Sequence, residues 1–208
     1  MPKSTITLLL FLFSAGVAQA DIRLFGNHPT IHLENMGVLT QNQRDGLEKF
    51  QMGKPYCGAI FVEKGGSGWG SFTGAHNMND AMEAAIRICQ HHADAGKCTL
   101  AGIIYPEDMT TANIPQDTLS QRASDKFRIY SSRSEGHRAF AKSQMNSFGW
   151  ATRRDTAQQA IEAALTFCYT SSMKALMKLQ VGLRAKALED GLYTCRIIDH
   201  AKPNADPS

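Results

Sequence analysis

The chain has 208 residues, with 22 lysines and arginines against 19 aspartates and glutamates, which gives a formal net charge of +3. So small an excess of positive charge excludes the strongly basic surface that is typical of proteins binding nucleic acids or anionic membranes. The length is enough for one domain or for two small ones.

Residues 1–20 have the three parts of a secretory signal peptide. Lys3 supplies the positive charge, residues 6–13 form a short apolar core, and residues 18–20 are the Ala-Gln-Ala that precedes a cleavage site. The apolar core is too short to cross a bilayer and no other stretch qualifies, so we expect no transmembrane segment. The mature protein is therefore predicted to begin at Asp21 and to be periplasmic or secreted.

Residues 21–105 are predicted to hold an N-terminal segment followed by a helix, a β-hairpin, a second helix and a strand. Thr40 and Gln43 form a capping-box pattern before the first helix, and glycines fill the middle of the hairpin. Asp80, with Glu83 three residues later, is predicted to open the second helix. In chain order the first helix covers 41–52, the hairpin 56–75 and the second helix 80–92, and the strand starts at Cys98.

Residues 106–117 are predicted to be a linker, and residues 118–200 then repeat the same order of elements. An insert over 171–190 has leucines on one side of a helix and lysines on another, and Gly182 is expected to weaken or kink it. Residues 201–208 are expected to form a disordered tail. The elements predicted after the linker are a helix over 118–131, a hairpin over 137–153, a helix over 156–170 and a strand over 193–199.

An internal repeat is the strongest pattern in the sequence. AMEAAIRIC at 81–89 matches AIEAALTFC at 160–168, and Gly68-Trp69 matches Gly149-Trp150. We therefore predict an α+β fold of two tandem α-β-β-α-β repeats, each with a β-hairpin and a strand packed on helices.

The five cysteines of an exported chain indicate disulfides with one thiol left over. In each repeat a cysteine ends the alanine-rich helix and another precedes the final strand, and these two positions can approach closely enough for a disulfide. The prediction is one disulfide in each repeat, with Cys57 as the free thiol. The predicted pairs are Cys89–Cys98 and Cys168–Cys195.

Two groups of residues suggest chemistry, and each has a simpler explanation. His91 and His92, between the first two cysteines, raise the alternative of a metal site, but the second repeat has no histidines at the matching positions, so no metal is predicted. Cys57 is matched by His137 in the second repeat, and a thiol beside an imidazole is the minimum for nucleophilic catalysis. A free cysteine in a strand is more often a small buried apolar residue, so no catalytic residue is assigned.

Three features are candidate contact surfaces. Tryptophan is enriched where proteins bind partners, although a tryptophan in a hairpin more often covers a neighbouring helix. The hairpin loops 64–68 and 144–148 are expected to be accessible, and the basic insert is typical of a helix that touches a partner or caps the core. The candidate contact residues are Trp69, Trp150, Lys174, Lys178 and Lys186.

The repeat resembles the exported bacterial domain family of unknown function that is numbered 4189. The resemblance rests on the Gly-Trp in a hairpin, the alanine-rich helix that ends in cysteine and the second cysteine before a strand. It covers residues 55–105 and 136–199, as two tandem copies. The family implies neither a reaction nor catalytic residues.

These observations predict an exported, non-enzymatic module that binds a ligand or a protein of the bacterial cell envelope, without a cofactor. The partner is expected to be a protein or another envelope component, and not a nucleic acid. The first alternative is a periplasmic thiol or metal-binding protein that uses Cys57 or the pair His91 and His92. A hydrolase with a site between the repeats is the third hypothesis.

Overall fold

The computed structural model describes residues 22–53, 55–94, 96–109 and 118–202. The predicted signal peptide, most of the predicted linker and most of the predicted tail therefore lie outside the described residues. Within these ranges no helix is both long enough and apolar enough to cross a membrane.

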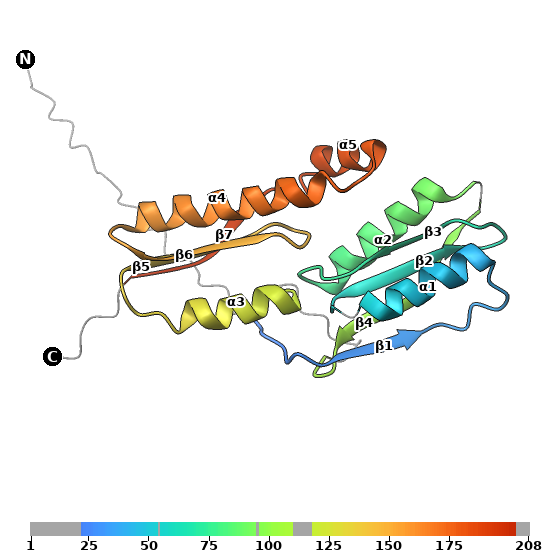
Figure 1. The fold of residues 1–208 in the computed structure, drawn as a ribbon, viewed down its shortest axis with the longest axis horizontal. Coiled ribbons are helices and arrows are strands. Elements are labelled where there is room, and N and C mark those ends of the chain that lie inside the picture. Colours follow the sequence, from blue (N-terminus) through green and yellow to red (C-terminus); the bar gives the residue numbers. More distant parts are fainter. Residues whose placement is uncertain (1–21, 54, 95, 110–117, 203–208) are drawn as a thin grey trace, which may run out of the picture.

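The protein is a mixed α+β fold with two antiparallel sheets, which lie side by side along its long axis (Figure 1). We call residues 22–109 the first half and residues 118–202 the second half. The strand order is β1-β4-β2-β3 in the first half and β6-β5-β7 in the second. The elements are β1 (Pro29–Leu33), α1 (Gln41–Gly53), β2 (Gly58–Glu63), β3 (Trp69–Phe72), α2 (Met78–His92), β4 (Cys98–Pro106), α3 (Gln121–Ser131), β5 (His137–Lys142), β6 (Phe148–Arg154), α4 (Ala157–Leu176), α5 (Val181–Glu189) and β7 (Arg196–Ala201).

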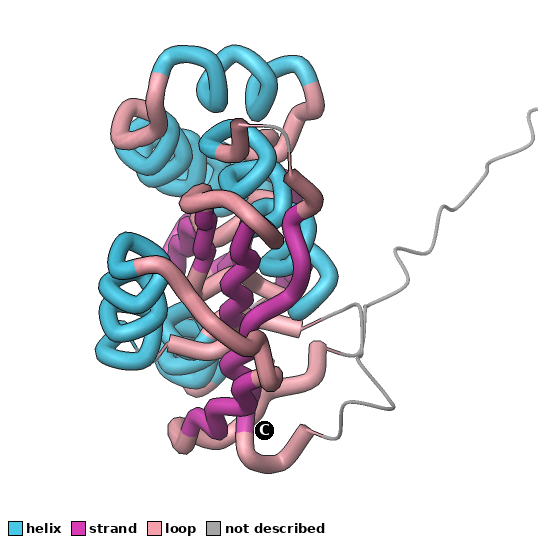
Figure 2. Tube along the Cα trace, turned by 90° about the vertical axis from the view of Figure 1, so that its right-hand side faces the viewer, coloured by secondary structure: helices cyan, strands magenta, loops and turns pink. Residues whose placement is uncertain are grey.

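In each half the sheet lies between two helices, as the end-on view also indicates (Figure 2). Successive side chains of a strand point to opposite faces of its sheet. In β3, Gly70 faces the backbone of α2, whereas Trp69 lies against Gly46 of α1. In β6, Gly149 faces α4 in the same way, and Trp150 packs in the cluster that includes α3 residues. In the second half, the sheet face without this glycine carries the larger side chains Phe140, Phe148 and Trp150.

The sequence match of Gly68-Trp69 with Gly149-Trp150 is wrong by two residues. Gly70 pairs with Phe61 of β2, and Gly149 pairs with Ala141 of β5. The helix backbone atoms nearest to these two glycines are the amide nitrogens of Cys89 and Cys168, which end the matching sequences. Gly149 therefore takes the place of Gly70, and Phe148 takes the place of Trp69.

The helix starts follow the predicted capping rules in one case and depart from them in another. The capping box before α1 is confirmed, since Gln43 N–H donates to Thr40 Oγ1 over 3.3 Å and Thr40 N–H donates to Gln43 Oε1 over 3.1 Å. Helix α2, however, begins two residues earlier than expected, because Asn77 is its cap and accepts from Asp80 N–H. Glu83 has no capping role and pairs with Arg87 instead.

The insert and the N-terminal segment also depart from the prediction. Helix α4 continues to Leu176, so the insert provides its last turns, and α5 follows as a separate helix. The break falls at residues 177–180 and not at Gly182, which lies in the first turn of α5. Strand β1, which was not predicted, pairs with β4 at the edge of the first sheet.

Both disulfides form the predicted pairs, Cys89–Cys98 and Cys168–Cys195, with sequence separations of 9 and 27. Because a longer loop loses more entropy on closure, replacing Cys168 and Cys195 by alanine is expected to cost about 3.5 kcal/mol of unfolding free energy, against about 2.5 kcal/mol for Cys89 and Cys98. Urea denaturation of the two double variants measures both losses. Equal losses, or the reverse order, would contradict this account.

The side chain of Glu63 leaves no room for a Cβ atom at two glycines of the first hairpin loop, Gly66 and Gly68. Its buried carboxylate accepts hydrogen bonds from Gly68 N–H over 3.0 Å, Asp94 N–H over 3.1 Å and Gly96 N–H over 2.7 Å. A Cβ atom at Gly66, Gly68 or Gly96 would come within 3 Å of this side chain. The loop after β2 and the loop after α2 are thus held together around one carboxylate.

Replacing Glu63 by alanine is expected to lower the unfolding free energy by about 2–3 kcal/mol, because three backbone donors lose a charged acceptor. Urea denaturation measures the change. Glu48→Ala is the matched control, since Glu48 lies exposed on α1 and its replacement is expected to change stability by less than about 0.5 kcal/mol. A Glu63 variant as stable as the control would show that the carboxylate is not needed.

Candidate binding cleft between the two halves

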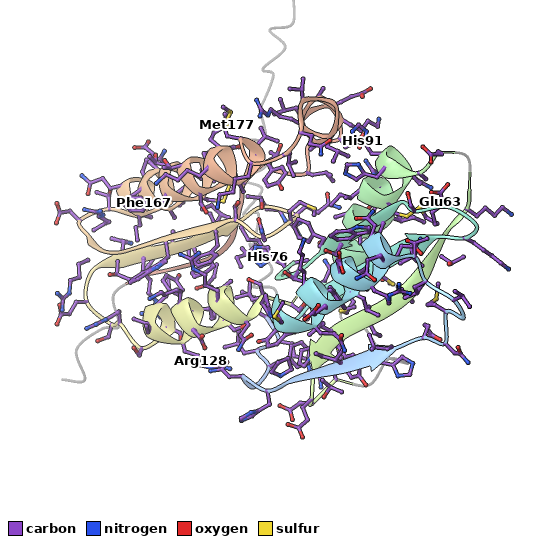
Figure 3. All side chains as sticks on the ribbon, turned by 45° about the vertical axis from the view of Figure 1, so that its right-hand side comes forward. Glu63, His76, His91, Arg128, Phe167 and Met177 are labelled. Carbon is purple, nitrogen blue, oxygen red and sulfur yellow. A yellow bond between two sulfur atoms is a disulfide. The ribbon has the colours of Figure 1, made fainter. Side chains whose placement is uncertain are left out.

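The imidazole of His76 is the centre of the contact between the halves (Figure 3). His76 precedes α2 and is fully buried. Its Nδ1 accepts from Ser120 N–H over 3.1 Å, which places the proton on Nε2, and Nε2 donates to the carbonyl oxygen of Ser147 over 3.0 Å. The backbone N–H of His76 donates to Met145 O over 2.9 Å, and the hydroxyl of Thr118 donates to His76 O.

The pKa of His76 is lowered to about 3, mainly by burial and to a smaller extent by the charge of Lys142, while the hydrogen bond to Ser147 acts in the opposite direction. The ring is therefore neutral at ordinary pH and does not act as an acid or base near neutrality. Its role is to hold the loop between β5 and β6 against the first half. That loop, expected to be an accessible contact surface, is instead largely covered, with Met145 and Ser147 buried.

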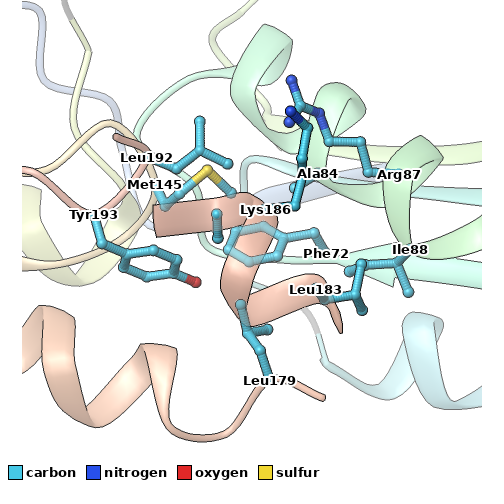
Figure 4. Close-up of a pocket in the computed structure, with 11 residues that line it drawn as sticks. Phe72, Ala84, Arg87, Ile88, Met145, Leu179, Leu183, Lys186, Leu192 and Tyr193 are labelled. Carbon is cyan, nitrogen blue, oxygen red and sulfur yellow. The ribbon is translucent and has the colours of Figure 1, made fainter. Parts of the chain in front are cut away.

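An apolar seam lies beside this contact, under α5. Figure 4 shows its small pocket, which encloses about 50 Å³. Arg87 stands at its edge and pairs with Asp190 across the halves. The volume is far below the roughly 300–1,000 Å³ of usual ligand pockets, so this pocket fits one small apolar side chain at most. Its lining residues are Phe72, Ala84, Arg87, Ile88, Met145, Leu179, Leu183, Lys186, Ala187, Leu192 and Tyr193.

A larger, polar cleft opens at the same boundary between the halves, and we call it the junction cleft. Its volume is about 600 Å³, within the usual range of ligand sites, which are often found between domains. The start of α2, the end of β5, the following loop and the segment from α5 to β7 build it. The lining residues are Asn77, Asp80, Lys142, Gln144, Gly191, Thr194 and Arg196.

Charged groups of both signs line the junction cleft. Asp80 is 8% exposed, and its carboxylate accepts from Gln144 Nε2 over 3.1 Å and from Asn77 Nδ2. Burial raises the pKa of Asp80, although hydrogen bonds and the charge of Lys142 act in the opposite direction. Lys142 is 4% exposed and donates from Nζ to Thr118 O over 3.0 Å. Arg196 is exposed at the start of β7.

The two tryptophans are half-buried, and neither lines this cleft. Trp69 packs against the first hydrophobic core and lies over Gly46 of α1. It also lines a separate surface hollow with Ser71 and His92. Trp150 packs against the core under α3. Packing against the two hydrophobic cores therefore explains the presence of both tryptophans.

The three lysines of the insert do not form one surface. Lys174 and Lys178 are exposed at and just beyond the end of α4, beside the exposed side chains of Met173 and Met177; Figure 3 shows Met177 at the outer surface. Lys186 instead lines the apolar pocket and pairs with Glu189 and Asp190.

The histidines and the free cysteine are placed in structural roles. His91 lies within 3.2 Å of Gln180 Oε1 and so contacts the insert. Among the described residues there is no group of three His, Cys, Asp or Glu side chains that could hold a metal ion. Cys57 is buried, and burial, then the charge of Asp80, raises its pKa to about 12. His137 begins β5 at the end opposite to Lys142, in the other half of the protein.

The residues of the junction cleft were not predicted from the sequence. Their positions come from three separate segments, 77–80, 142–144 and 191–196, so no local motif unites them. One signal was present: Lys142 ends a strand whose other inner positions are apolar, at a position where the first sheet has Val62.

Comparison with known proteins assigns the chain to no family: no protein-family model matches it, and neither a curated protein nor a solved structure matches it.

Proposed function

We propose that the protein is an exported, non-enzymatic binding module of the bacterial cell envelope, and that the junction cleft is its binding site. The observation that carries the proposal is a polar cleft of about 600 Å³ at the boundary between the halves. Cys57 and His76, two side chains capable of nucleophilic or acid–base chemistry, are buried with pKa values moved away from neutrality, which disfavours catalysis by these two residues.

The proposal includes an origin by duplication, with two tandem copies of the exported domain family numbered 4189. Three correspondences between the halves support it. The hairpin and returning strand have the same order in both sheets, a glycine faces the cysteine-ended helix in both, and a disulfide joins that helix to the next strand in both. Export is supported by these disulfides, which form in oxidising compartments, and by the signal-like sequence at 1–20.

A photo-cross-linking residue at Thr194 tests the binding role in the cells that produce the protein. Thr194 is exposed at the cleft, and Met52, 66% exposed on α1, is the control position. We expect a discrete adduct, measured as an added mass on the purified protein, from Thr194 and not from Met52. The same adduct from both positions, or none from either, would contradict a binding role for the cleft.

Fractionation of the same cells tests export. We expect the protein outside the cytoplasm with an N-terminus at Asp21 in the mass spectrum. Full-length protein confined to the cytoplasm would contradict export and with it a role in the cell envelope.

A further inference from the structure

From the charges of the junction cleft we infer its ligand class: a hydroxylated oxyanion, that is, a polyol that carries a carboxylate or phosphate group, such as an acidic sugar. This inference rests on the proposed function, because it names the ligand of the same cleft. Three features of the cleft lead to it: a pair of neighbouring cations, a buried carboxylate beside them, and neutral polar groups at the rim.

The two cations stand directly opposite each other. Lys142 of β5 and Arg196 of β7 are cross-strand partners, so both side chains start on the same face of the sheet. Like charges in this arrangement repel each other, and an anion bound between the two would reduce that repulsion.

The fold itself does not require cations at these two positions. The strand pair β2–β4 of the first sheet corresponds to β5–β7, since both join the first hairpin strand to the returning strand. There, Val62 occupies the place of Lys142 and pairs with Thr99, which occupies the place of Arg196. The first sheet forms with neutral side chains at these two positions, so the second sheet presents two cations at the cleft that the fold alone does not need.

Arg196 is the group that is most available to an anion. It is exposed at the cleft, and among the described residues it makes no ion pair or side-chain hydrogen bond. Its planar guanidinium matches the two oxygens of a carboxylate or phosphate. Lys142 contributes a point charge from the cleft wall.

The carboxylate of Asp80 disfavours an anion that carries no hydroxyl group as the preferred ligand. Its carboxylate lies on the same cleft as the two cations, and it would repel an anion that brings no hydrogen-bond donor. A hydroxyl group on the ligand can donate to Asp80, while Thr194 and the amide oxygen of Gln144 offer further polar partners at the rim. A ligand with both an oxyanion and hydroxyl groups satisfies all of these side chains.

Titration calorimetry with the whole mature protein, from Asp21 onward, tests this ligand class with five probes. Glucuronate and glucose 6-phosphate carry both features, glucose has only hydroxyls, and acetate and inorganic phosphate have only the anion. We expect at least one of the first two to bind about tenfold or more tightly than each of the three simpler probes. Comparing the affinities of glucuronate and glucose 6-phosphate shows whether the cleft prefers a carboxylate or a phosphate. Binding of glucose, acetate or inorganic phosphate at equal strength overturns the inference, as does a lack of binding by both glucuronate and glucose 6-phosphate.

Arg196→Gln is the decisive variant, because the exposed side chain can change without disturbing the core. We expect it to weaken the binding of the charged sugar about tenfold or more, and Arg196→Lys to weaken it less. Arg154→Gln makes the same change of charge on the same sheet, at the end of β6 away from the cleft, and should leave binding unchanged. Equal effects of Arg196→Gln and Arg154→Gln overturn the inference. An adduct at Thr194 without binding of any charged sugar would leave the binding function standing and reject this ligand class alone.

Discussion

Replacing Gly70 or Gly149 by alanine is expected to lower the unfolding free energy by about 3 kcal/mol or more, at the upper end of overpacking effects. A Cβ atom at Gly70 would lie 2.2 Å from the amide nitrogen of Cys89, and one at Gly149 would lie 2.3 Å from that of Cys168. The obstructing atoms belong to the helix backbone, so they cannot move aside as a side chain can. The helix would have to move away from the sheet over its whole contact.

Guanidinium chloride denaturation with the disulfides intact measures this effect. Gly53→Ala is the matched control, because a Cβ atom at Gly53 would meet no atom within 4 Å, and its stability should change by less than about 0.5 kcal/mol or increase. If Gly70→Ala and Gly149→Ala both cost less than about 1 kcal/mol, the close contact between sheet and helix is not rigid.

Replacing His76 by alanine is expected to cost about 3–4 kcal/mol, because a fully buried side chain is lost and the buried partners of its ring lose their hydrogen bonds. His76→Gln keeps polar atoms at the site and should cost less. Urea denaturation at pH 7.5 measures both losses. An alanine variant as stable as the unchanged protein would remove His76 from the contact between the halves.

His76 also makes stability depend on pH in a defined direction. Its pKa is about 3 in the folded protein and about 6.5 in the unfolded chain, so only the unfolded chain takes up the proton between these values. The contribution of the neutral His76 ring to the unfolding free energy is fully present above about pH 6.5. It is lost, at about 1.4 kcal/mol per pH unit, as the pH falls toward 3. Asp80, whose pKa is raised, acts in the opposite sense at acid pH.

Asp80 and the other carboxylates are present in both the unchanged protein and His76→Gln. The difference between the two in the pH dependence of the unfolding free energy therefore reports on the histidine alone. Between pH 7.5 and pH 4.5 the unchanged protein is expected to lose about 2–3 kcal/mol more than the variant. Identical pH dependences would show that the buried ring is not the group responsible.

The local structure could be predicted from the sequence because its signals are local. Apolar periodicity and the Thr40–Gln43 capping box indicated α1, and the alanine-rich segments that end in Cys89 and Cys168 indicated α2, α4 and the disulfide positions. The sequence GWG at 68–70 has a glycine on each side of the tryptophan, and residue matching chose the wrong one. Only packing against the helix shows that Gly70 is the counterpart of Gly149.

The long-range structure could not be predicted for a related reason. Strand β1 is short, and its partner β4 lies far along the chain. No hairpin turn therefore follows β1 to indicate a strand in the sequence. His76 follows the hairpin as an ordinary loop residue, and its partners Ser120 and Ser147 lie in the other half. A single sequence contains no pattern that brings these segments together, and the junction cleft depends on all of them.

The contact around His76 has a consequence for the order of synthesis. The first half leaves the ribosome before the residues that cover it: Met145 and Ser147, which meet His76, and Leu192, which packs with Ala84. At usual rates of synthesis roughly 100 further residues take about 5–20 seconds. During that time the imidazole and the apolar residues of the first half lack the side chains that cover them in the folded protein.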